Sequence, residues 1–160
     1  MRDRVWNNLA DTLFKSIYLN KVSNQAYHWG NAYSIFLALA TASSVAAWAV
    51  WEKFPVLWAT IVAISQILHI IKPYFYFIKN DKEFIEMSLM FEGVYLSYEK
   101  LWYDLQKNGL DMDEAEKIFY ENRQKELNIS KSYKHVVCPT INSLMTKADT
   151  ETNNFLQTHF

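Results

Sequence analysis

Two apolar runs near the middle of the chain, residues 29–51 and 54–71, constrain its fold more than any other feature. The first holds 23 residues and the second 18, and neither contains Asp, Glu, Lys or Arg. Only Glu52 and Lys53 separate them. A helix rises about 1.5 Å per residue, so about 20 apolar residues cross a hydrocarbon core of about 30 Å. The sequence therefore predicts two transmembrane helices joined by a very short turn.

The two runs divide the chain into three parts. Residues 1–28 repeat apolar side chains at spacings of three and four, which predicts an amphipathic helix. It could pack on the rest of the protein or lie on a membrane surface. Residues 29–79 form the predicted transmembrane hairpin, with spans at about 30–51 and 54–72. Residues 80–160 form a cytosolic helical module, so we expect an all-α membrane protein.

Basic residues predict the orientation of this hairpin. They flank it on both sides, whereas its turn has only Lys53. The positive-inside rule then predicts a bacterial inner-membrane protein with both termini in the cytoplasm. The flanking basic residues are Arg2, Arg4, Lys15, Lys21, Lys72, Lys79 and Lys82.

Polar side chains within the predicted spans are candidates for lining a pore, because polar groups in hydrocarbon usually face a bundle interior or a water-filled path. Serine and threonine hydroxyls could instead bond to their own helix carbonyls. Gln66 and His69 could form an interhelical hydrogen bond or face a hydrated lumen, and Lys72 could extend to the membrane boundary. The pore-lining candidates are Thr41, Ser44, Ser65, Gln66, His69 and Lys72.

Two further patterns predict helix association. Small residues spaced by four in the first run let helix backbones approach closely, namely Ser34, Ala38, Ala42 and Ala46. Two helices cannot enclose a lumen, so a pore needs several copies of the chain. A heptad seam could provide the assembly contact, or could pack on the chain's own helices. The seam residues are Phe84, Met87, Phe91, Val94, Tyr98, Leu101 and Leu105.

Catalytic signatures are sparse. Glycine occurs only at positions 30, 93 and 109, which leaves no glycine-rich phosphate loop. His135 and Cys138 are too few for a zinc site, and one cysteine excludes an intramolecular disulfide. We therefore expect a protein that is not an enzyme, with no cofactor, no metal and no catalytic residue.

This layout resembles the SLATT family of prokaryotic two-transmembrane effectors, which are associated with nucleotide-signalling systems. The resemblance rests on residues 33–51, the turn at 52–55, residues 56–71 and the long helix from Asn80. It implies an antiphage defence effector that oligomerises and opens a membrane pore. A tetramer is one expected form of the homo-oligomer. It also implies gating by a nucleotide or oligonucleotide made by a neighbouring nucleotidyltransferase.

The expected function is thus an oligomeric pore- or ion-channel-forming effector whose partners are the lipid bilayer and further copies of itself. One alternative is a non-conducting adaptor, in which the hairpin only anchors the helical module to a membrane. A third is a soluble helical bundle that buries the hairpin.

Overall fold

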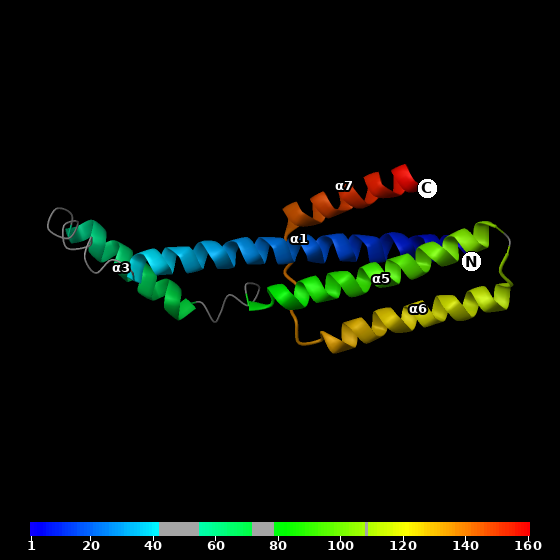
Figure 1. Cartoon of the computed structure of the whole chain (residues 1–160), viewed down its shortest axis with the longest axis horizontal. Helices are drawn as coiled ribbons and strands as arrows, with labels where there is room; N and C mark the ends of the chain where they lie inside the picture. Colours follow the sequence, from blue (N-terminus) through cyan, green and yellow to red (C-terminus); the bar gives the residue numbers. More distant parts are fainter. Residues whose placement is uncertain (42–54, 72–78, 108) are drawn as a thin grey trace. The chain divides into compact units, whose positions relative to one another are not determined.

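The computed structural model describes residues 1–41, 55–71, 79–107 and 109–160, and in these ranges it contains helices and connecting turns but no strand. The helices divide between two compact units (Figure 1). Residues 1–24 and 80–160 form one, which we call the bundle unit, and residues 25–79 form the other, the apolar unit. The helices are α1 (Arg2–Thr41), α3 (Pro55–Ile71), α5 (Asp81–Gln106), α6 (Met112–Ser132) and α7 (Asn142–His159).

The transmembrane assignment is corrected by the helices themselves. Within the described ranges, no helix combines the length and the apolar content that a bilayer crossing requires. Helix α3 has 17 residues, and α1 ends at Thr41, so it contains only residues 30–41 of the first predicted span, among them the polar Asn31. The predictions of spans at about 30–51 and 54–72, of a membrane channel and of an inner-membrane location are therefore wrong for the described helices. Residues 42–51, 54 and 72 of these spans, and the turn residues Glu52 and Lys53, lie outside the described ranges.

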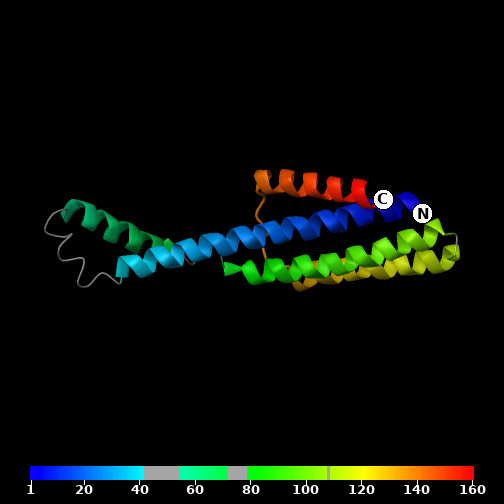
Figure 2. The ribbon, with the colours of Figure 1, turned by 45° about the horizontal axis from the view of Figure 1, so that its top comes forward.

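The bundle unit is built on the apolar face of its first helix. Val5, Leu9 and Val22 of α1 are completely buried, and Leu13 and Leu19 are nearly so. Val5, Leu9 and Leu13 follow at spacings of four, and Leu19 and Val22 at a spacing of three, which is typical of the apolar face of a helix. Figures 1 and 2 show α5 beside this part of α1, α6 beside α5, and α7 along α1. The N-terminal helix is thus packed in the bundle, which is one of its two predicted placements.

Side chains of α1 hold the neighbouring helices in register. The Ser88 hydroxyl of α5 donates to the Ser16 carbonyl at 2.8 Å. The Tyr18 hydroxyl donates to the Pro139 carbonyl and accepts from the Ile141 backbone N–H at 3.1 Å. Because Ile141 directly precedes α7, Tyr18 fixes where that helix begins.

A buried carboxylate links three helices at the centre of the bundle unit. Glu126 of α6 accepts a hydrogen bond from the Tyr98 hydroxyl of α5 at 2.9 Å. Its other oxygen lies 3.3 Å from Nη1 of Arg123 and 3.6 Å from Nζ of Lys15 on α1. The Glu126 side chain is 8% exposed, so these partners compensate for much of the solvation that it loses.

Tyr98 gives the bundle unit a predictable alkaline instability. Burial and the hydrogen bond to Glu126 raise its pKa above the ordinary value of about 10. Above that pH the unfolded chain releases the phenol proton while the folded chain keeps it, so stability falls. We expect a loss of about 1.4 kcal/mol per pH unit from Tyr98 above about pH 10. Urea denaturation at about pH 8 and about pH 11 measures this. Tyr98→Phe should remove that share of the slope, and an unchanged slope would contradict the assignment.

Candidate assembly surfaces

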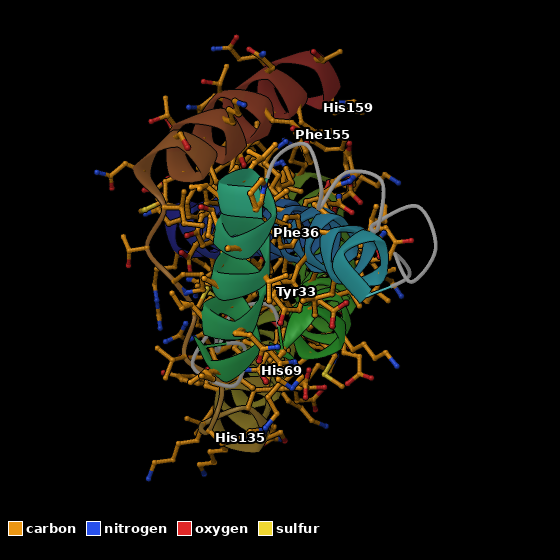
Figure 3. All side chains as sticks on the ribbon, turned by 90° about the vertical axis from the view of Figure 1, so that its left-hand side faces the viewer. Tyr33, Phe36, His69, His135, Phe155 and His159 are labelled. Atoms are coloured by element: carbon orange, nitrogen blue, oxygen red, sulfur yellow. The ribbon has the colours of Figure 1, made fainter. Side chains whose placement is uncertain are left out.

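The apolar unit joins the end of α1 to one narrow face of α3. The Tyr33 hydroxyl of α1 donates to the Leu68 carbonyl of α3 at 3.2 Å, and Figure 3 shows Tyr33 on α1 and His69 toward one end of α3. Ile61, Ser65 and Leu68 follow at spacings of four and three and are the less exposed of the α3 side chains that the structure describes. They mark the side of α3 that is covered within the unit.

Most of the other described side chains of α3 are apolar and exposed. Val56 is 79% exposed, Ile70 is 67% exposed and Ile67 is 54% exposed. Large apolar side chains of α1 in the same unit are similarly open, with Ile35 at 61% and Trp29 at 59%. Monomeric proteins in water rarely expose contiguous apolar patches of more than a few hundred Å². A helix that is apolar on most of its circumference usually has a covering partner.

Three of the predicted pore-lining residues, Ser65, Gln66 and His69, have described side chains, and all three lie on α3. Ser65 is buried and its hydroxyl donates to the Val62 carbonyl at 2.8 Å, which is the back-bonding that was expected as an alternative. Gln66 and His69 are exposed on α3. Thr41 is the last residue of α1, whereas Ser44 and Lys72 lie outside the described ranges.

The predicted small-residue face is only partly described. Ser34 is exposed on α1, and its hydroxyl donates to the Gly30 carbonyl at 2.9 Å. Ala38 is exposed on the same helix. Ala42 and Ala46 lie outside the described ranges, so the helix contact predicted for this face stays a prediction.

The predicted heptad seam of α5 packs within the chain. Six of its residues are buried in the bundle unit, and Met87 is half-buried. The seam therefore cannot be the free surface that was predicted for assembly, and the alternative of packing on the chain's own helices describes it. The six buried residues are Phe84, Phe91, Val94, Tyr98, Leu101 and Leu105.

The groups considered for metal binding are not assembled either. Cys138 is a free, exposed thiol in the connection before α7, and His135 precedes it in the same segment. The described residues contain no group of three or more His, Cys, Asp or Glu side chains that could hold a metal ion. Exposed apolar helix surface is the feature of the described structure that most needs a partner.

Three comparisons with known proteins accompany this geometry. No family model, curated protein or solved structure matches the chain. The resemblance to the SLATT family consequently rests on the arrangement of residues in the sequence alone.

Proposed function

We propose that this chain functions by self-assembly, as a helical adaptor that is not an enzyme. In this proposal the exposed faces of α3 and of the end of α1 pack against the same faces of further copies. The bundle unit is then the folded module that each copy contributes. The observation that supports self-assembly most directly is the exposure of Val56, Ile70 and Ile35, which is between 61% and 79% in a single chain.

The proposal agrees with the energetics of apolar surface. Fully burying a side chain such as Val, Leu or Ile gains about 1.5–3 kcal/mol. Several of these side chains per copy offset the loss of translational and rotational freedom, which costs about 4–15 kcal/mol on association. A second copy supplies a surface of the same chemistry and the same shape, as in a closed symmetric oligomer.

The proposal leaves out two expectations from the sequence. Conduction through a membrane depended on the two spans that are corrected above. A nucleotide trigger and a role in defence follow only from the family resemblance, and no described side chain has been assigned to either. Self-association needs neither of them.

Light scattering on the eluting full-length protein tests the proposal. In lipid-free buffer we expect a molar mass that exceeds the 18.9 kDa of one chain and rises with concentration. A mass of one chain at every concentration would contradict self-assembly. Flotation with phosphatidylcholine vesicles by a protein that does not self-associate would assign the exposed faces to lipid instead.

A further inference from the structure

A glycine in the middle of α5 has no explanation in the described part of the structure. Gly93 lies near the centre of a 26-residue helix, where glycine is among the least favourable residues. It is exposed, and a Cβ added there would meet no neighbouring atom within 4 Å. Neither a tight turn nor crowding from the bundle unit requires glycine here. A close approach from outside the chain would.

The surface around Gly93 is apolar at its centre and charged at both ends. Leu89 is 58% exposed, Met90 is 46% exposed and Leu96 is 54% exposed. At about 100° per residue, every member of this surface projects within about 60° of Gly93. We call it the Gly93 face, and it consists of Lys82, Glu86, Leu89, Met90, Gly93, Leu96, Ser97, Lys100 and Asp104.

The charges of the Gly93 face are arranged symmetrically with opposite signs. Glu86 and Lys100 lie seven residues before and after Gly93, and Lys82 and Asp104 lie eleven residues before and after it. Two antiparallel copies of α5 that cross at Gly93 would place each residue opposite its counterpart across the glycine. Every charge would then face a charge of opposite sign, in four ion pairs. Parallel pairing in register would instead place like charges together.

These charged groups are available for such pairing. Lys82, Lys100 and Asp104 form no ion pair with any described residue, although their spacing along the helix allows pairs with neighbours four residues away. Glu86 accepts one hydrogen bond, from the Tyr133 hydroxyl at 2.9 Å, through one of its two carboxylate oxygens.

We infer that the Gly93 face binds the same face of a second copy, antiparallel, about a twofold axis at Gly93. Leu89, Met90 and Leu96 then form the apolar centre of the contact, and the glycines allow the two backbones to approach closely. The opposite charges at the two ends specify the antiparallel direction. This inference rests on the proposed self-assembly, to which it adds a second surface in the other unit.

Charge reversal in the full-length chain tests the pairing. The charge reversals are made in a chain that already carries Val56→Gln, Ile67→Gln and Ile70→Gln, which remove apolar contacts of α3. We expect this background chain to form a dimer through α5 alone. Glu86→Lys alone and Lys100→Glu alone should each weaken that dimer by about tenfold or more, because each places like charges in contact twice. A mixture of the two variants should restore it as a heterodimer. Glu121→Lys, at an exposed position of α6, is the matched control and should leave the dimer unchanged.

Gly93→Gln provides an independent test. Glutamine is a good helix former in open space, so the variant should fold at least as stably while its dimer weakens by about tenfold or more. Sedimentation velocity measures the dimer affinity of the charge-reversal variants and of Gly93→Gln. The α5 pairing would be overturned if the chain with the three α3 substitutions were already monomeric and the α5 variants had no effect on the unsubstituted chain. The proposed function would still hold in that case. If assembly instead responded to the α5 variants but not to the α3 substitutions, the proposed assembly through α3 would be overturned and the α5 pairing would be supported.

Discussion

Tyr98→Ala should lower the free energy of unfolding of the bundle unit by about 3–5 kcal/mol, a range typical of removing a buried aromatic ring. Tyr98 is 0% exposed, and its ring lies 5.9 Å from that of Phe119. The substitution leaves a cavity and also removes the hydroxyl that donates to the buried Glu126. Urea denaturation followed by circular dichroism measures the loss.

Two control variants separate the loss of the buried ring from the loss of an exposed ring and from the loss of the hydroxyl alone. Tyr120→Ala removes the same type of side chain from a position that is 55% exposed, and should cost less than about 1 kcal/mol. Tyr98→Phe keeps the ring and should cost about 1–3 kcal/mol, the usual effect of losing a hydrogen bond to a charged group. Equal losses for Tyr98→Ala and Tyr120→Ala would show that Tyr98 is not in the core.

Replacing three exposed residues of α3 should have the largest effect on assembly. The chain with Val56→Gln, Ile67→Gln and Ile70→Gln should associate about a thousandfold more weakly through this surface. Each buried apolar side chain contributes about 1.5–3 kcal/mol, and every 1.4 kcal/mol is a factor of ten. Since all three side chains are at least 54% exposed in the single chain, the stability of the bundle unit should not change.

A matched control separates this effect from a general loss of apolar surface. Met112→Gln, Leu127→Gln and Met145→Gln replace three exposed apolar residues of the bundle unit, at exposures between 37% and 61%. This second triple variant should assemble as the unsubstituted chain does. Equal weakening by both triple variants would count against a specific contact through α3.

Helical periodicity predicted much of the bundle unit, because local spacing determines which face of a helix is apolar. The seven-residue seam of α5 is an example, since six of its positions are in the core. Spacing does not show which partner covers a face, however. The same seam suits another copy or the chain's own helices, and only the tertiary structure distinguishes these.

The buried polar cluster could not be predicted from apolar spacing. The core face of α6 contains Asn122 and Glu126 at positions where the periodicity of Ala115, Phe119 and Ile129 would place apolar residues. These two polar side chains interrupt the apolar stripe of α6, whereas the apolar Leu127 is 45% exposed. The heptad spacing of α6 does place Glu126 on the core face. A carboxylate is acceptable there because Tyr98 and Lys15 lie beside it, and only the tertiary structure shows these partners.

The transmembrane prediction failed for a different reason. The described helices contain only part of the two predicted spans: α1 includes residues 29–41 of the first run, among them the polar Asn31, and α3 has 17 residues. Apolar side chains of α3 are exposed in the single chain, so this helix needs a covering partner.

Sedimentation velocity in lipid-free buffer, on the full-length chain and on the triple variant Val56→Gln, Ile67→Gln and Ile70→Gln, tests self-assembly most directly. The unsubstituted chain should sediment as a concentration-dependent oligomer, and the triple variant as a species no larger than a dimer. Identical sedimentation of the two proteins, whether as single chains or as the same oligomer, would contradict assembly through the exposed face of α3.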